Sequence, residues 1–276
     1  MNIEIVSVSD IGKIRPHNED STISDARLGI ALVADGMGGY KAGEVASAIA
    51  ATSILNDVKS GLKQLGVIAK QTNKENGYNS QSQLLIKAIT HANSMIYNKA
   101  QEEELCRGMG TTIVIGLFYD GMISVANVGD SRLYLLRENN FKQITKDHSL
   151  LQEVIDKGKV PREKAEAMTP RNLVTRALGI EARVKVDIFE EQVKNDDIYL
   201  LCSDGLNDMV TDEEIHLTLS KYSVNLQQAA NELVAMANSR GGRDNISIIL
   251  AQIKSTNNNV KSFNIFKRKN DVLGIK

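Results

Sequence analysis

The chain has 276 residues, 42% of them hydrophobic, which fits one large domain with a substantial core better than two full domains. Its 33 basic and 34 acidic residues leave a formal charge of −1, so the sequence lacks the basic footprint of a nucleic-acid-binding protein. Two cysteines cannot build a disulfide framework, and without a signal peptide or a long apolar run we expect a cytoplasmic protein that is not integral to a membrane.

Short apolar runs rich in Val, Ile and Leu predict strands. In chain order they are residues 3–8, 28–34, 112–119, 122–128, 132–137, 184–188, 197–202 and 246–252. Asp120 and Gly121 alone separate two of these runs, which is a hairpin signal because glycine accepts positive φ. We therefore expect antiparallel pairing.

Three longer segments have apolar residues at helical spacing. They are residues 43–62, 81–101 and 226–238, and the last is stopped by Gly241-Gly242. The strings TDEE from Thr211 and SLLQ from Ser149 have the capping-box arrangement of a helix start. Pro161 can open a further short helix.

Two polar segments do not fit the core. Residues 66–82 are rich in Asn and predict an exposed loop between helices. Residues 255–276 follow the last predicted strand and are expected to form a mobile tail outside a domain of residues 1–254. The cluster FKRK in this tail leaves open a role in docking to an anionic partner or a membrane surface.

Four aspartates stand where predicted strands end or begin. Asp35, Asp130 and Asp204 each close an apolar run, and Asp244 comes just before the last strand. Each could be an ordinary turn residue, since Asp is common in turns. If these strand ends converge with the two acids at positions 19–20, however, the clustered carboxylates repel one another unless cations neutralise them. The joint pattern predicts a metal site.

The type of donor narrows the metal. These candidates offer hard oxygen ligands, whereas the histidines and cysteines show none of the spacings expected of zinc sites. Magnesium or manganese is therefore favoured, and the sequence does not choose between them. Gly36, Gly38 and Gly39 let the backbone approach an ion closely, and the Gly36 carbonyl could itself be a ligand.

Eight strings in a fixed order carry a resemblance that extends to about residue 253. RPHNED, DGMGG, GMGTT, NVGDSR, DHS, RALG, SDGL and GGRDN resemble the metal-dependent serine/threonine phosphatases of the protein phosphatase 2C (PP2C) family, most closely the compact bacterial members. The resemblance implies an α+β fold, a four-layer α-β-β-α sandwich in which helix pairs flank two antiparallel sheets. A small flap is expected at about residues 150–175, where it would read the protein substrate.

The same resemblance implies the activity. Phosphoserine and phosphothreonine in proteins are hydrolysed by a water that two Mn2+ or Mg2+ ions activate, without a covalent intermediate and in opposition to bacterial serine/threonine kinases. The expected partners are phosphorylated proteins, including such a kinase, and the protein is expected to be a monomer. Nucleic acid is not an expected partner.

Site roles also follow from the resemblance, position by position. Asp35 matches the carboxylate that bridges the two metals, and Gly36 matches the carbonyl ligand of the second metal. Asp204 and Asp244 match the remaining protein ligands of the first metal. Glu19 matches the acid that serves the second metal directly or through water.

Three further residues complete this set. Asp130 matches the residue that joins Asp204 at a third, weaker metal, and Asp20 is expected to hold a water beside the ions. Arg15 matches the phosphate-binding arginine, because a guanidinium fork can hold two phosphate oxygens at once.

One position departs from the animal members of the family, which have a histidine at Met37 that is thought to protonate the leaving alcohol. Bacterial members commonly lack it, which implies that a metal-bound water is the donor here. His148 beside a helix start is expected to be structural, and His17 either tunes phosphate binding or is simply exposed.

Two other enzyme classes require motifs that this sequence lacks. A cysteine-dependent phosphatase would need a phosphate-cradling Arg at a fixed distance after Cys106 or Cys202, and a P-loop enzyme would need a GK[ST] ending after the glycines; both are missing. An inactive family member that serves as a binding module remains open. So does a phosphatase dedicated to a partner-switching regulator of sigma factors.

Overall fold

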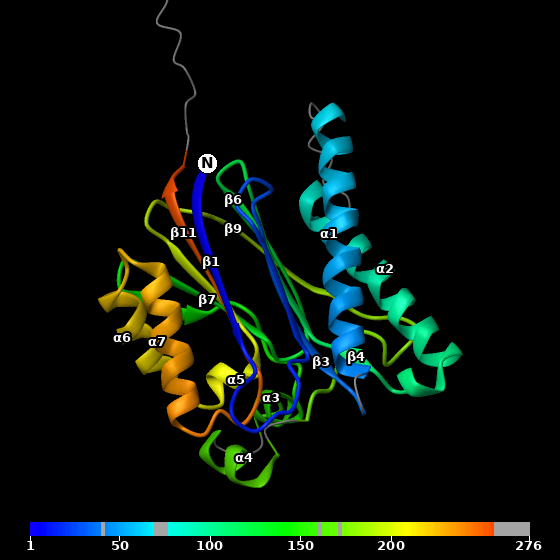
Figure 1. The fold of residues 1–276 in the computed structure, drawn as a ribbon. Coiled ribbons are helices and arrows are strands. Elements are labelled where there is room, and N and C mark those ends of the chain that lie inside the picture. The colour runs from blue at the N-terminus through cyan, green and yellow to red at the C-terminus, as the bar shows by residue number, and fades with distance from the viewer. Residues whose placement is uncertain (40–41, 69–76, 159–161, 171–172, 257–276) are drawn as a thin grey trace, which may run out of the picture.

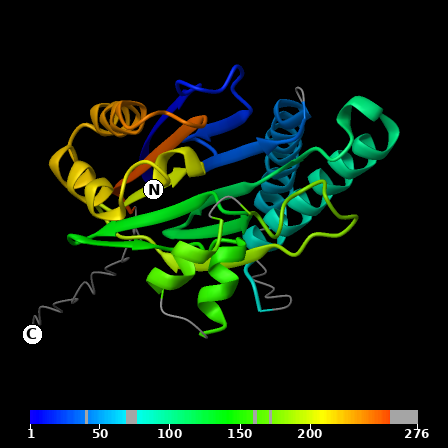
Figure 2. The ribbon, with the colours of Figure 1, turned by 90° about the horizontal axis from the view of Figure 1, so that it is seen from below.

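The computed structural model describes residues 1–39, 42–68, 77–158, 162–170 and 173–256. Within them, two antiparallel sheets stack face to face, and a pair of helices covers the outer face of each (Figure 1). Figure 2 shows the layers edge-on, with α1 and α2 on one side and α6 and α7 on the other. This is the expected α+β sandwich.

The first sheet has the strand order β1-β11-β10-β7-β8. Its strands are Asn2–Asp10 (β1), Ile246–Ser255 (β11), Ile198–Cys202 (β10), Arg132–Arg137 (β7) and Asn140–Gln143 (β8). The helices on its outer face are Asp212–Lys221 (α6) and Leu226–Ser239 (α7). Because β1 pairs with β11, the first and last strands of the sandwich lie side by side.

The second sheet has the order β2-β3-β5-β6-β9, and the short strand β4 pairs with β3. Its strands are Asp20–Asp25 (β2), Ile30–Met37 (β3), Gly110–Thr111 (β4), Ile113–Tyr119 (β5), Met122–Val128 (β6) and Asp187–Gln192 (β9). It is covered by Ala42–Ile68 (α1) and Ser80–Glu102 (α2). The shorter helices are the 3-10 turn Glu104–Cys106 (η1), Leu150–Asp156 (α3), Arg162–Met168 (α4) and Asp204–Asn207 (α5).

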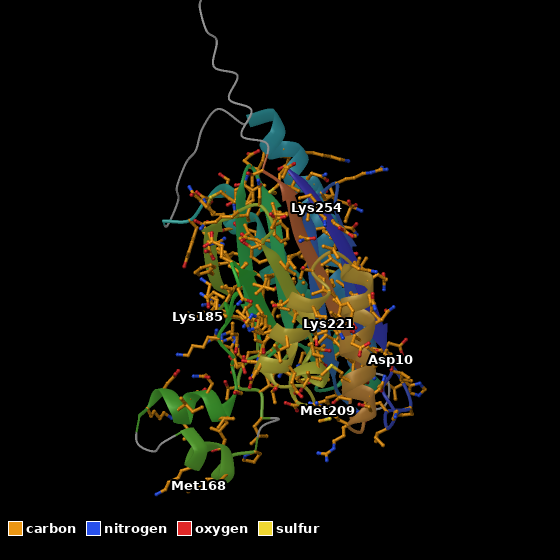
Figure 3. The ribbon with its side chains drawn as sticks, turned by 90° about the vertical axis from the view of Figure 1, so that its left-hand side faces the viewer. Asp10, Met168, Lys185, Met209, Lys221 and Lys254 are labelled. Carbon is orange, nitrogen blue, oxygen red and sulfur yellow. The ribbon has the colours of Figure 1, made fainter. Side chains whose placement is uncertain are left out.

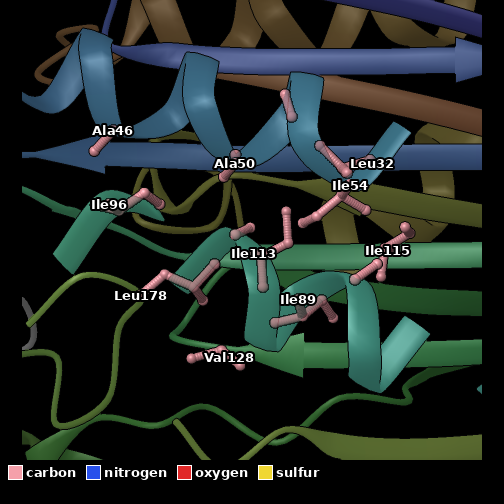
Figure 4. Close-up of a cluster of buried hydrophobic side chains, with 14 of the residues drawn as sticks. Leu32, Ala46, Ala50, Ile54, Ile89, Ile96, Ile113, Ile115, Val128 and Leu178 are labelled. Atoms are coloured by element: carbon pink, nitrogen blue, oxygen red, sulfur yellow. The ribbon is translucent and has the colours of Figure 1, made fainter. Parts of the chain in front are cut away.

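The core beneath α1 and α2 depends on small side chains at helical spacing. Ala46, Ala50 and Ile54 recur every four residues on α1 and are completely buried. Because alanine side chains are small, α1 can lie close to β3. Figure 4 shows these side chains against Leu32 of β3 and Ile89 of α2.

Strand β3 lies at the centre of the packing because both of its faces are buried. Leu32 and Ala34 face the helix pair, while Ala31 and Val33 contribute to the core between the two sheets. A slip of one residue would exchange these two sets. The register of β3, and with it the position of Asp35, is therefore strongly specified.

Turn and cap chemistry agrees with the sequence in three places. Asp120 and Gly121 have φ of 42° and 78° and join β5 to β6 as a two-residue hairpin. Thr211 forms the complete capping box of α6 with Glu214. Ser149 caps α3 by accepting a hydrogen bond from the backbone of Gln152.

Several strand predictions need correction. β2 and β8 were not predicted, because their sequences DSTISD and NFKQ are polar and half-exposed at or near sheet edges. The two-residue β4 was also missed. The strand expected at residues 184–188 is β9 at Asp187–Gln192, since the apolar run VKV precedes the strand and packs beneath α1 and α2 instead.

Helix α1 extends to Ile68 rather than to residue 62, so the predicted loop at 66–82 is shorter than expected. Residues 69–76 of that loop, Pro161 and residues 257–276 of the tail lie outside the described residues. Of the helices described, none is long and apolar enough to cross a membrane.

Candidate metal centre

Acidic side chains from both sheets meet at one end of the sandwich, the end marked by β4 and α5 in Figure 1. Asp35 lies near the end of β3, and Asp20 is its direct partner on β2. Asp204 begins α5 directly after β10, and Asp244 precedes β11. Asp130 follows β6. The strand ends named from the sequence therefore converge.

Asp20 and Asp35 lie opposite each other across neighbouring strands, an arrangement that destabilises the fold when both are charged. Loss of solvent raises the pKa of Asp35 well above its usual value, and the negative charges of Asp20 and Asp204 raise it further. Loss of solvent likewise raises the pKa of Asp20 to about 6. Without a cation, the floor of the site therefore disfavours the charged forms of these two carboxyl groups.

The residues that follow Asp204 and Asp244, Gly205 and Asn245, are in close backbone contact. A side chain at Gly205 would place its Cβ 2.0 Å from the carbonyl oxygen of Asn245, so only glycine fits there. Desolvation raises the pKa of Asp204 well above its usual value, with further contributions from Asp130, Asp208 and Asp244. Asp204 therefore interacts with Asp244 and Asp20 on one side and with Asp130 and Asp208 on the other.

Glu19 and two glycines form a tight cradle beside Asp35. A Cβ at Gly36 would lie 2.1 Å from the carbonyl oxygen of Gly43 and 2.6 Å from that of Glu19. A Cβ at Gly43 would lie 2.8 Å from Glu19 Oε1. The N-terminal end of α1 therefore approaches the β2–β3 edge so closely that side chains cannot intervene.

Arg15 brings a positive charge to the edge of the cluster. Its Nη2 lies 2.7 Å from Asp244 Oδ2, and the side chains of the two residues are 48% and 32% exposed. The hydrogen bond to Asp244 raises the pKa of Arg15. The negative charges of Glu19 and Asp35 raise it further. The guanidinium is thus exposed and close to the acids, where a phosphate group could reach it.

A neighbouring cavity of about 260 Å3 extends the acid cluster past Asp130 and Asp204. Asp147, Asp208 and Asp212 also line it. Desolvation raises the pKa of Asp130 to about 6, and the charges of Asp147 and Asp208 contribute. Sequence reasoning missed Asp208, although its spacing of four residues from Asp204 on a helical turn was a usable signal.

Polar residues that sequence reasoning also missed hold the site in shape. Thr111 Oγ1 donates to the backbone carbonyl of Asp35 at 2.9 Å, and the Thr112 backbone N–H donates to the same carbonyl at 2.9 Å. Asn245 accepts a hydrogen bond from the Glu19 backbone and donates to the His17 carbonyl. These contacts explain why GMGTT and GGRDN accompany the acids in the sequence.

The donors of this cluster suit a hard divalent cation. All are carboxylate or carbonyl oxygens, and the buried atoms Asp20 Oδ1 and Asp204 Oδ1 have no hydrogen-bond partner among the described residues. Within the same residues, no three His, Cys, Asp or Glu side chains already stand as a complete set of ligands. Asp244 and Asp20 instead bond Arg15 and Ser203, so these oxygens would have to exchange partners on binding an ion.

His148 is buried beside the start of α3. Its Nδ1 accepts a hydrogen bond from the Gly129 N–H, and its Nε2 lies 2.8 Å from Arg176 Nη1 and 3.1 Å from Asp187 Oδ2. This is a structural position, as predicted. The His17 side chain is exposed.

Comparison with known proteins identifies close relatives of the chain. The family model for protein phosphatase 2C matches residues 17–239. The serine/threonine phosphatase Stp of Listeria welshimeri is 38% identical over 247 residues, which are 88% of this chain and 93% of that protein. The serine/threonine protein phosphatase PstP of Mycobacterium tuberculosis is 39% identical over 248 residues, 89% of this chain and 44% of that protein.

Solved structures show the same fold. The crystal structure of the Mycobacterium tuberculosis phosphatase PstP aligns with a TM-score of 0.78 at 32% identity, covering 92% of this chain and 100% of that chain. The catalytic domain of PstP in complex with two manganese ions aligns with a TM-score of 0.76 at 32% identity, covering 91% and 98%.

Proposed function

The chain belongs to the protein phosphatase 2C family, and we propose that the acid cluster around Asp35 is the active site with which it hydrolyses phosphoserine and phosphothreonine in proteins. The enzyme is a metal-dependent serine/threonine phosphatase, and its relative PstP has been crystallised with two manganese ions. The observation that carries the assignment of the site is the convergence of Asp20, Asp35, Asp204 and Asp244, whose mutual repulsion a divalent cation would relieve.

Two ions would be held by five residues. Asp35, Asp204 and Asp244 would hold the first ion, and Asp35 would also serve the second. The Gly36 carbonyl and Glu19 would hold the second ion beside the narrow cradle that Gly36 and Gly43 form with Glu19. When bound, Mn2+ or Mg2+ supplies a nucleophile at neutral pH and neutralises charge on the phosphoryl group.

Asp130 and Asp204 line the neighbouring cavity and would hold a third, weaker ion. Asp20 holds a water beside the ions, for which its buried Oδ1 is suited because it has no hydrogen-bond partner among the described residues. Ser203 donates to Asp20 Oδ2 at 2.8 Å and so fixes which oxygen is available.

Arg15 binds and orients the substrate. Its guanidinium can donate two parallel hydrogen bonds to phosphate oxygens, which would hold the phosphoryl group beside the acid cluster in a fixed orientation. Charge that accumulates on the phosphoryl oxygens in the transition state is stabilised by the same group. The fixed acids and the Arg15 fork leave no need for a covalent enzyme intermediate.

The physiological substrates are proposed to be phosphorylated proteins that include a serine/threonine kinase, which the enzyme would oppose as a monomer. We take residues 1–254 as the phosphatase domain and 150–175 as the flap. The flap contains α3 and α4, which project from the body of the molecule in Figure 3, where Met168 marks the far helix.

The test is hydrolysis of phosphothreonine peptides and of para-nitrophenyl phosphate by the purified protein, with and without Mn2+. We expect turnover only with the ion, together with loss of turnover in Asp35→Asn. Phosphoproteomics of cells with and without the protein would then name the substrates. Hydrolysis of the peptides in excess chelator would contradict the assignment of a metal-dependent active site. So would the absence of hydrolysis with both Mn2+ and Mg2+.

A further inference from the structure

A groove of about 580 Å3 is lined in part by Met37, which ends β3 two residues beyond Asp35. Apart from Met37, its lining comes entirely from the segment 174–185 between the flap and β9. The lining residues are Val174, Thr175, Arg176, Ala177, Ile180, Glu181, Arg183, Val184 and Lys185. The groove therefore reaches the strand that carries Asp35 and is built from residues to which the hydrolysis itself gives no task.

The wall of the groove is fixed to the strand that carries Asp35. Thr111 and Leu178 exchange two backbone hydrogen bonds of 3.1 and 2.9 Å, and the same Thr111 donates through Oγ1 to the Asp35 carbonyl. Gly179 donates to Asn93 Oδ1 of α2 at 2.9 Å. A group bound in the groove would therefore stand at a defined distance from the reacting phosphorus.

The groove has an excess of positive charge. Arg183 and Lys185 are exposed, and neither has an ion-pair partner in the part of the chain that the structure describes. Arg176 is paired with Asp187 at 2.8 Å, and Glu181 is the acid within the lining. By contrast, Arg132, Arg137 and Arg240 all face carboxylates, and the whole chain has a formal charge of −1.

The rim of the groove has apolar side chains that a small phosphate ester would not need. Ile180 is 50% exposed, and Leu173, next to the lining residue Val174, is 47% exposed. In Figure 3, Lys185 lies on the side of the molecule from which the helix pair with Met168 projects. A channel with cationic and apolar side chains, open to solvent and reaching the strand that carries Asp35, suits an extended peptide better than a compact ligand.

We propose that this groove binds the stretch of the phosphoprotein that flanks the phosphorylated residue, and that Arg183 and Lys185 favour substrates with acidic side chains in that stretch. The proposal rests on the proposed function and adds a substrate preference to it. Opposite charge at this site attracts an acidic flank and repels a basic one, an effect that weakens as salt is added.

The test compares two phosphothreonine peptides of equal length, one with glutamates and one with lysines around the phosphothreonine. Wild-type enzyme with Mn2+ should have the higher kcat/KM on the acidic peptide. In the double variant Arg183→Glu/Lys185→Glu, the ratio of the two kcat/KM values should fall by about tenfold, the size expected when two solvent-exposed charge contacts turn repulsive. Hydrolysis of para-nitrophenyl phosphate, which has no flanking residues, normalises the values.

The matched control is Arg27→Glu/Lys63→Glu. Arg27 precedes β3 and Lys63 lies late in α1, so both stand at the other end of these elements from the metal centre. This pair makes the same charge change and should leave the ratio as in wild type. An equal fall in the control, or equal losses on both peptides and on para-nitrophenyl phosphate, would overturn the proposal.

Two further outcomes separate the groove from the activity. Wild-type enzyme that hydrolyses both peptides equally well would overturn the groove proposal while leaving the phosphatase assignment intact. Protein that hydrolyses no phosphate ester with Mn2+ or Mg2+ would contradict the proposed function itself. A wild-type preference that shrinks as salt is raised from about 0.05 to 0.3 M would support the electrostatic origin.

Discussion

Arg15 Nη2 lies 2.7 Å from Asp244 Oδ2, so the residue proposed to bind phosphate shares a hydrogen bond with a proposed metal ligand. Arginine therefore competes with a cation for the same oxygen.

Arg15→Ala should lower kcat/KM for a phosphopeptide by about 100-fold, because the phosphoryl oxygens lose their charged donors. The affinity for Mn2+ measured by calorimetry should not fall. Arg15→Lys, which keeps the charge and loses the fork, should recover only part of the activity, and weaker Mn2+ binding in either variant would contradict this competition.

Asp35→Asn should abolish turnover while leaving the fold intact. Because the carboxylate repels Asp20 and Asp204, the variant in chelator should have a Tm at least as high as that of wild type. Added Mn2+ should raise the Tm of wild type and leave that of the variant nearly unchanged. Asp57→Asn, on the outer helix α1, is the control and should respond to Mn2+ as wild type does. Hydrolysis by Asp35→Asn near the wild-type rate would refute the role of Asp35.

Gly36→Ala tests the cradle beside Glu19. The new Cβ would stand 2.1 Å from the Gly43 carbonyl oxygen, and relief of that contact requires the start of α1 or the end of β3 to move. We expect a loss of about 1–3 kcal/mol in the free energy of unfolding, measured with denaturant, together with weaker Mn2+ binding. Gly39→Ala, just beyond the end of β3, meets no atom within 4 Å and should cost little. Equal behaviour of the two variants would show that the backbone around Gly36 adjusts freely.

Acid pH should destabilise the protein through His148. Burial lowers the pKa of His148 below 6.5, the charge of Arg176 lowers it further, and Asp187 and Asp147 oppose this. As pH falls below 6.5, the unfolded chain therefore takes up the proton before the folded protein does, and stability falls with pH in that window. Well above pH 6.5, where the ring is neutral in both the folded and the unfolded chain, this residue contributes no pH dependence.

His148→Gln provides the comparison, because glutamine does not titrate. Unfolding by denaturant in chelator should show the variant less stable than wild type at pH 8, where it lacks the bonds to Gly129 and Asp187. The difference in stability should shrink at pH 5.5. Only wild type loses stability there, because its histidine is protonated more readily in the unfolded chain than in the folded protein. A difference that is constant with pH would exclude His148 as the titrating group.

The layered arrangement of the fold could be predicted from the order of the motifs and the family resemblance. The strands at the edges of the sheets could not. Buried strands such as β3 and β5 are continuous apolar runs and were predicted to within a few residues. β2 and β8 are polar strands that owe their conformation to a neighbour, which no local pattern reveals. Helix α1 extends beyond its predicted end at residue 62, where it packs against α2, a contact that no local pattern reveals.

The candidate site was named from the positions of acids at strand ends, and these acids converge. What the sequence could not reveal was the pairing within the cluster, such as Asp20 opposite Asp35 or Asp244 facing Arg15, because both depend on how separate segments meet. The supporting residues Thr111 and Asn245 act through hydrogen bonds to backbone groups of distant segments. Nothing in their own type distinguishes them from ordinary polar residues.

The pairing of β1 with β11 has a consequence for synthesis on the ribosome. A growing chain has Arg15, Glu19 and Asp35 early, but it cannot complete the cluster until Asp244 and the strand after it have emerged. Contacts between segments this far apart form late. Unfinished copies of the enzyme therefore cannot remove phosphate from their neighbours, and activity begins only with a translated and closed sandwich.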